Sequence, residues 1–200
     1  MAFILLSPAS PAAASGAGAP IRWNTGGAVW STSQDSFDIF LRTGEVTDRG
    51  LAAGLAASGW PVDQLRAALA KSYTVDFLAV SRFLNSEAGE RFLRRATTSY
   101  GPYDRMTSTA VPALRSAILS DAVDGSISSA GILRALPTAF RLADNGNGHS
   151  GAQPICAPGH CRSGTAQCTS LLSWYAFLPA CIQARQVTAS EGALPSASAP

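Results

Sequence analysis

A serine next to a histidine is the first feature of this 200-residue sequence that could do chemistry. Residues Gly148-His149-Ser150-Gly151-Ala152 come close to the Gly-x-Ser-x-Gly turn of a serine nucleophile, but the position two after Ser150 is Ala152 instead of glycine. That turn also needs a buried strand before it and a helix after it, whereas a polar, turn-forming stretch precedes this serine. The one later histidine, His160, has no acid placed beside it. We therefore expect no catalytic Ser/His/Asp triad.

Cysteines and a histidine near the C-terminus form the second candidate site. Cys156, His160, Cys161 and Cys168 could each bind zinc, but their spacing does not give the regular C-x2-C pairs of structural zinc sites. We expect no metal site there. Together with Cys181, the cysteines either form two disulfides, in any of three connectivities, or remain unpaired thiols.

Residues 121–128 share some letters with a calcium-binding loop. If Gly125 were the sixth loop position, the twelfth would be Gly131 instead of the bidentate glutamate that calcium requires. A turn that ends one helix, followed by a serine that caps the next, explains the same residues. We expect no calcium site.

Two glutamates lie four residues before arginines on a predicted helix. Glu87 with Arg91, and Glu90 with Arg94, have the favourable order for helix-surface ion pairs, each worth a few tenths of a kcal/mol. We interpret these carboxylates as surface pairs and not as an acid/base pair. No residue of the chain is then expected to be catalytic, to bind a cofactor or to bind a metal.

The elements that would position such residues are short helices. Apolar residues recur at helical spacing between serine, threonine or aspartate caps and glycine or proline stops. The pattern predicts helices at about 35–42, 48–58 with Thr47 as cap, 62–72, 75–85, from 86 onward, 109–123 and 128–136. Residues 21–30 fit a small N-terminal hairpin. The expected fold class is all-α, an irregular bundle of six or seven short helices, with a disordered C-terminal tail.

The distribution of charge divides the chain into three parts. Residues 35–144 carry 24 of the 28 charged side chains, whereas the last part contains every cysteine and histidine and little charge. We predict a leader at 1–20, a helical domain at 21–142, and an irregular, low-complexity tail at 143–200. The apolar island of that tail, residues 174–178, either docks on the helical domain or marks a partner site.

The leader begins with an apolar run and ends in small residues, as an export signal does before its cleavage site. The usual positive region is missing, because no lysine or arginine precedes Arg22. We prefer the interpretation of a shortened export signal, which would place the protein in the periplasm or outside the cell. The alternative is an Ala/Pro-rich leader of no consequence.

Composition excludes two function classes. The net charge of +2 provides no basic face for phosphate contacts, so we expect no nucleic-acid partner. No uninterrupted apolar stretch approaches the roughly 18 to 20 residues that cross a bilayer, so we expect no transmembrane segment.

Several runs of residues in the middle resemble a catalogued domain of unknown function. That domain is found at the N-terminus of predicted exported α/β-hydrolases, mostly cyanobacterial and related to dienelactone hydrolases. The most specific run is Ala79-Val80-Ser81-Arg82-Phe83-Leu84, and the likeness covers about residues 21–142. The runs that carry it are residues 40–46, 65–69, 75–86, 89–90, 113–117 and 132–138.

The resemblance implies a helical domain that precedes a hydrolase domain and has no established function of its own. A full member would continue with a doubly wound domain of some 200 or more residues. The first hypothesis is therefore a non-catalytic accessory domain that packs on a hydrolase domain, in a truncated or frame-shifted member of the family. The second is an exported helical interaction module with a disulfide-bonded tail. The third is a serine esterase, as the family label implies.

Overall fold

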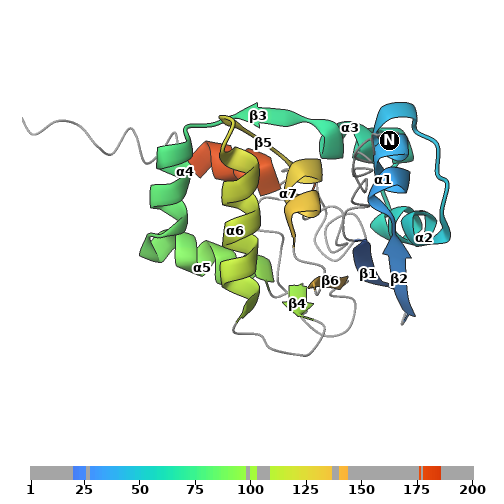
Figure 1. Ribbon diagram of the computed structural model, residues 1–200, viewed down its shortest axis with the longest axis horizontal. Coiled ribbons are helices and arrows are strands. Elements are labelled where there is room, and N and C mark those ends of the chain that lie inside the picture. Colours follow the sequence, from blue (N-terminus) through green and yellow to red (C-terminus); the bar gives the residue numbers. More distant parts are fainter. Residues whose placement is uncertain are drawn as a thin grey trace, which may run out of the picture.

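A computed structural model describes residues 20–25, 28–97, 100–102, 109–136, 140–143, 176 and 178–185 of the chain. The helices of this part are short and cross one another irregularly, with two small sheets between them (Figure 1). The expected fold class, an irregular bundle of short helices, is confirmed. The labelled helices are α1 Gln34–Thr43, α2 Arg49–Ser58, α3 Val62–Ala70, α4 Phe77–Leu84, α5 Glu87–Ala96, α6 Ala110–Ala122 and α7 Ser129–Ala135.

The helix boundaries follow local capping chemistry. Ser33 caps α1 by accepting from the Ser36 amide at 3.0 Å, and Gly44 ends that helix with a left-handed φ of 85°. For α2 the predicted cap, Thr47, is wrong by one residue. The carboxylate of Asp48 accepts from the Leu51 amide at 2.7 Å, because Asp48 is correctly placed for the third helical amide.

The predicted N-terminal hairpin is present and belongs to a larger sheet. Strands β1 (Ile21–Thr25) and β2 (Ala28–Thr32) pair antiparallel, with Trp23 opposite Trp30. Strand β6 (Phe140–Ala143) runs parallel to β1 and antiparallel to β4 (Tyr100–Pro102), which gives the order β2-β1-β6-β4. The sheet thus joins the start of the helical domain to its end.

A second, two-stranded sheet lies among the helices. The predicted third helix extends too far, because α3 ends at Ala70 and residues Ser72–Thr74 form β3. This strand pairs antiparallel with β5 (Ser126–Ser128), and Val75 donates to the Gly125 carbonyl at 2.9 Å. Gly125 has a φ of 76°, which suits glycine and makes the turn between α6 and β5.

One hydrophobic core spans the helices and the first sheet. Aromatic and aliphatic side chains from every labelled helix contribute to it, and each fully buried one contributes roughly 1.5 to 3 kcal/mol to stability. The largest fully buried side chains are Trp23, Phe37, Phe40, Leu51, Leu69, Leu84, Leu93, Leu114, Ile118, Ile127 and Ile132.

The expectation of an irregular, disordered tail is wrong for one segment. Residues 178–185 form a helix, here called the C-terminal helix, which lies behind α6 in Figure 1 (red). Ala176, Leu178 and Ile182 are buried in the common core. Apolar residues at helical spacing can bury themselves against an existing core even when the surrounding sequence is rich in alanine, serine and glycine. The island at 174–178 therefore docks on the helical domain through at least Ala176 and Leu178.

Candidate docking groove

An open groove of about 520 Å³ lies between α4 and α6. Most of its lining is apolar, and two residues beside or within it are unusually exposed for their size. Leu78 is 59% exposed and Val123 is 64% exposed, while Phe77 is 37% exposed. The lining residues are Phe77, Pro112, Arg115, Ser116, Leu119, Ser120 and Val123.

The first turn of α4 leaves two large apolar side chains exposed, those of Phe77 and Leu78. The Asp76 carboxylate accepts from the Ala79 amide at 2.9 Å, so the helix begins at Phe77. Val80 and Leu84 are fully buried, and Leu78 lies on the opposite face of the helix and is 59% exposed. Phe77 shares the face of Val80 and Leu84 but lies at the start of the helix, beside the groove, and stays 37% exposed. The first turn of α4 therefore presents exposed apolar side chains next to the groove.

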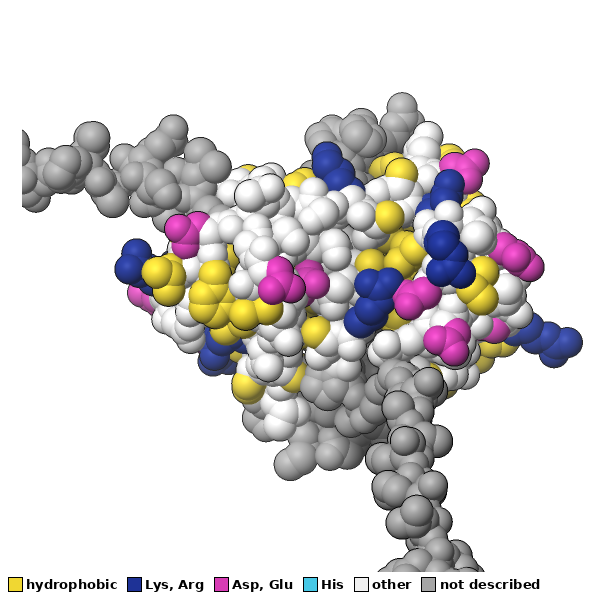
Figure 2. Space-filling view, turned by 45° about the horizontal axis from the view of Figure 1, so that its top comes forward, with side chains coloured by type: hydrophobic (Ala, Val, Ile, Leu, Met, Phe, Trp, Pro, Cys, Tyr) yellow, Lys and Arg dark blue, Asp and Glu magenta, His cyan; other side chains and the backbone are white. Residues whose placement is uncertain are grey.

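Hydrophobic side chains gather at the end of the molecule formed by α4 and α6, with acidic and basic side chains around them (Figure 2). The acids include Asp76 and Asp124, both exposed and each adjacent in sequence to a groove residue. An exposed apolar patch with a charged rim is typical of a protein-interaction surface.

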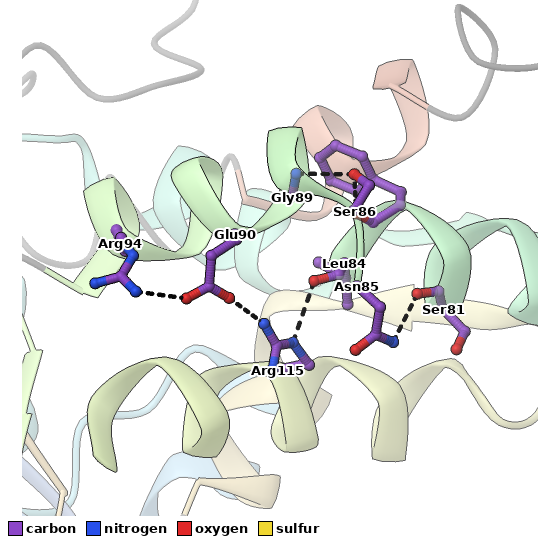
Figure 3. Close-up of polar contacts among 9 residues, drawn as sticks. Ser81, Leu84, Asn85, Ser86, Gly89, Glu90, Arg94 and Arg115 are labelled. Carbon is purple, nitrogen blue, oxygen red and sulfur yellow. Dashed lines mark hydrogen bonds and ion pairs between the residues drawn. The ribbon is translucent and has the colours of Figure 1, made fainter. Parts of the chain in front are cut away.

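One arginine ties the groove to two neighbouring helices (Figure 3). Arg115 of α6 donates from Nε to the Leu84 carbonyl oxygen at 3.1 Å, and its Nη2 pairs with Glu90 Oε2 of α5. The other oxygen of Glu90 pairs with Arg94 at 3.0 Å. Arg115 therefore fixes the spacing of α4, α5 and α6 through the rigid fork of its guanidinium group.

The turn between α4 and α5 is equally constrained. Ser86 caps α5 by accepting from the Gly89 amide at 3.1 Å, and Asn85 donates to the Ser81 carbonyl at 2.9 Å (Figure 3). A Cβ atom at Gly89 would lie 1.9 Å from the Phe83 carbonyl oxygen, so only glycine fits. Phe83 also packs on Phe92 with ring centroids 5.6 Å apart. These contacts hold the groove wall in one geometry.

Asp121, in the last turn of α6, is half-buried against the start of α7. Its Oδ2 accepts from the Ser128 amide at 2.7 Å, and the Ser128 hydroxyl accepts from the Gly131 amide at 3.0 Å to cap α7. Burial raises the pKa of Asp121 above its usual value of 3.8, although the Ser128 amide and the Arg134 charge act in the opposite direction. This carboxylate joins α6 to α7 and serves the fold. The turn that we expected in place of a calcium loop is present here.

Most of the candidate residues for chemistry that the sequence offered fall outside the part of the chain that the structure describes. Ser150, His149, His160, Cys156, Cys161 and Cys168 lie outside the residues that the structure describes. Within 20–143 and 176–185, as far as these are described, no cluster of His, Cys, Asp or Glu side chains could hold a metal ion. Cys181 is disulfide-bonded, which removes the free-thiol alternative for that residue.

The predicted ion pairs are present, and one has a further partner that sequence reasoning missed. Glu87 pairs with Arg91, and Glu90 with Arg94, on the surface of α5. The link from Glu90 to Arg115 spans 25 positions, so no helical spacing could reveal it. None of the helices in the described ranges is long and apolar enough to cross a membrane.

A family model described as "Alpha/beta hydrolase of unknown function (DUF1400)" matches residues 23–141 of the chain. This match covers α1 to α7 and begins and ends in the β2-β1-β6-β4 sheet. Neither the curated proteins nor the solved structures gave a match.

Proposed function

Because the chain belongs to the family of alpha/beta hydrolases of unknown function (DUF1400), we propose that its helical domain is a non-catalytic accessory domain that docks onto an α/β-hydrolase domain. One observation carries this proposal. The described part of the family match consists of short helices and two small sheets, in which only β1 and β6 pair in parallel. An α/β-hydrolase needs a mostly parallel sheet that lifts its nucleophile on a strand–turn–helix unit. The chemistry named by the family therefore belongs to a different domain.

The α4–α6 groove supports a docking role. Leu78 and Val123 are each more than half exposed, and covering them would remove apolar area from water. The groove wall is already fixed by Arg115, so docking requires little ordering of the accessory domain. Asp76 and Asp124 carry negative charge at the rim of the groove. The complementary surface of the hydrolase domain would therefore have an apolar ridge flanked by basic side chains.

Binding to a separately purified α/β-hydrolase domain of a family member, measured by titration calorimetry, tests the proposal. The double variant Leu78→Asp/Val123→Asp should weaken binding at least tenfold, because each aspartate would be buried against an apolar surface. Val62→Asp is the matched control, since Val62 is 41% exposed on α3, outside the groove. Equal losses in the double variant and the control would place the interface elsewhere, and no binding by the unaltered chain would reject the accessory role.

A serine esterase is the second candidate, favoured by the description of the family as a hydrolase. Hydrolysis of a short-chain nitrophenyl ester by the purified full chain tests it, with Ser150→Ala as the matched variant. Our proposal expects the two proteins to give the same rate as buffer. Activity that Ser150→Ala abolishes would replace the accessory role with an enzymatic one.

Export is the remaining part of the proposal. A cleaved leader at 1–20 would deliver the chain to an oxidising compartment, and the disulfide at Cys181 suits such a location. Expression of the full chain in a bacterial host, followed by fractionation and intact-mass measurement, tests this step. Uncleaved protein confined to the cytoplasm would reject it.

A further inference from the structure

The outer face of α6, which the structure describes along its whole length, carries no charged side chain. The helix has two charged residues, and both are engaged within the domain. Arg115 pairs with Glu90, and Asp121 accepts from the Ser128 amide. The exposed residues along the outer face are Pro112, Ser116, Ser120 and Val123. Because the solvent-facing side of a helix usually carries charged and polar residues, an uncharged outer face that ends in an exposed valine is typical of a surface that another protein covers.

Side-chain size varies along this face of α6. Ser116 and Ser120 are one helical turn apart and project little, whereas Val123, at the end of the helix, is more than half exposed. Leu119 is half-buried beside them and lines the same groove. Small residues one turn apart leave a shallow channel in which a second helix can pack closely.

Helix α4 runs antiparallel to α6 along one side of this channel (Figure 1). The start of α4 lies beside the end of α6, because the Val75 amide donates to the Gly125 carbonyl at 2.9 Å. The end of α4 lies beside the first half of α6, because the Leu84 carbonyl accepts from Arg115 Nε at 3.1 Å. The exposed residues of the two helices, here called the α4–α6 face, are Leu78, Arg82, Pro112, Ser116, Ser120 and Val123.

The two ends of the α4–α6 face have opposite charge. Asp76 and Asp124 are exposed where α4 begins and α6 ends. Arg82 is exposed in the last turn of α4, one helical turn after Leu78. Both glutamates of the neighbouring α5 pair with arginines, so they do not cancel this positive charge. Ser120 lies roughly midway between the two charged ends, since the residues of an antiparallel helix pair advance with the same rise.

We propose that the α4–α6 face pairs with the same face of a second copy of this chain, about a two-fold axis close to Ser120. The two α6 helices are antiparallel in this pair, so that Asp124 of each copy faces Arg82 of the other and both ends are neutralised. Val123 of each copy packs over the low position at Ser116 of the other. A second copy is favoured over an unrelated partner because one face carries both the acid and the base that such a pair requires.

Self-pairing covers the groove between α4 and α6, so it excludes any other protein from that groove. The dimer is then the closed state of the docking site that we propose for a hydrolase domain. Only this consequence rests on the proposed function, because self-pairing is measured on the chain alone.

Sedimentation equilibrium of the full chain, at protein concentrations up to about 1 mM, tests the pairing, since this range detects a dimer with a Kd near 1 mM. Asp124→Arg and Arg82→Asp should each weaken dimerisation about tenfold, because the two-fold repeats every substitution twice and like charges then meet. The double variant exchanges the two charges and should recover most of the loss.

Two further variants complete the experiment. Ser120→Arg should leave the chain monomeric, because two arginines at the axis would keep the α6 helices apart. Glu45→Arg is the matched control: it changes the net charge as Asp124→Arg does, and Glu45 is exposed between α1 and α2, outside the α4–α6 face. It should leave dimerisation unchanged.

Three results would overturn the proposal. A monomer at every concentration would show that the face does not pair with itself. A dimer that Ser120→Arg leaves intact would use another surface. A double variant that dimerises no better than Asp124→Arg alone would show that Asp124 and Arg82 do not meet. None of these results involves a hydrolase domain, so self-pairing and the accessory role fail independently.

Discussion

The Asp121 carboxylate lies directly against the backbone of Gly131, so that a Cβ atom at residue 131 would come within 1.6 Å of Asp121 Oδ1. The same carboxylate accepts from the Ser128 amide, three residues earlier. The last turns of α6 and the first turn of α7 can approach this closely only because residue 131 has no side chain. This contact joins the two helices.

Gly131→Ala should destabilise the domain by about 1 to 3 kcal/mol. The new methyl group would force the Asp121 carboxylate away from the Ser128 amide, and a hydrogen bond to a charged group is worth about that much. Urea unfolding followed by circular dichroism measures the change. In an Asp121→Ala background the same substitution should be neutral or stabilising, because alanine favours helix over glycine by roughly 1 kcal/mol. If the changes in unfolding free energy caused by Gly131→Ala and Asp121→Ala simply added up in the double variant, the two residues would not interact, which would contradict the predicted contact.

The stability of the domain should depend on Asp121 at acidic pH. Burial raises the folded-state pKa of this group above 3.8, so the folded chain binds the proton more tightly than the unfolded chain does. This tighter proton binding stabilises the folded chain. The stabilisation is fully present below the unfolded pKa of 3.8 and is lost as pH rises through the folded pKa. Asp121→Asn should therefore be more stable than the unaltered chain at neutral pH, and the difference should vanish as pH falls below 3.8. A difference in unfolding free energy that is constant with pH would contradict the shift.

Arg115→Ala should lower the free energy of unfolding by about 1 to 2 kcal/mol, because it leaves Glu90 and the Leu84 carbonyl without their shared partner. Arg115→Lys should not restore stability, since an ammonium group lacks the fork that reaches both acceptors. Arg91→Ala is the control: its side chain is 64% exposed and its partner Glu87 is 89% exposed, so a change under about 0.5 kcal/mol is expected. Thermal and urea unfolding of the three variants make the comparison. Equal costs for Arg115→Ala and Arg91→Ala would show that Arg115 does not hold the groove.

Thr32→Val should destabilise the first sheet by about 1 to 3 kcal/mol. The Trp23 indole Nε1 donates to Thr32 Oγ1 at 2.7 Å, both residues are fully buried, and valine would leave that donor without a partner. Thr32→Ser keeps the hydroxyl and should cost much less. Urea unfolding followed by tryptophan fluorescence compares them. If Thr32→Val cost no more than Thr32→Ser, the hydroxyl would contribute no more than the methyl group, and the predicted importance of the hydrogen bond would be contradicted.

The sequence by itself determined the local elements of this protein. Ser33, Gly44, Gly59 and Ser128 act on backbone groups within a few positions, so the helix ends that they set could be read directly from residue types. The pairs of α5 and the N-terminal hairpin follow from equally short spacings. Because these hydrogen bonds form between near neighbours in the chain, the predicted short helices could be read from the sequence, and the structure confirms the helical bundle.

Only the tertiary structure decided which distant segments meet. The pairings β3–β5 and β1–β6 and the contact of Arg115 with Glu90 join residues far apart in the chain, where no periodicity applies. Asp121 contacts Gly131 across the turn between two helices, a contact that the spacing within either helix does not predict. The groove exists because α4 and α6 are held side by side by such contacts. The C-terminal helix is the clearest case. It lies in a sequence rich in alanine, serine and glycine, and burial of Leu178 and Ile182 in a core made by other segments holds it in place.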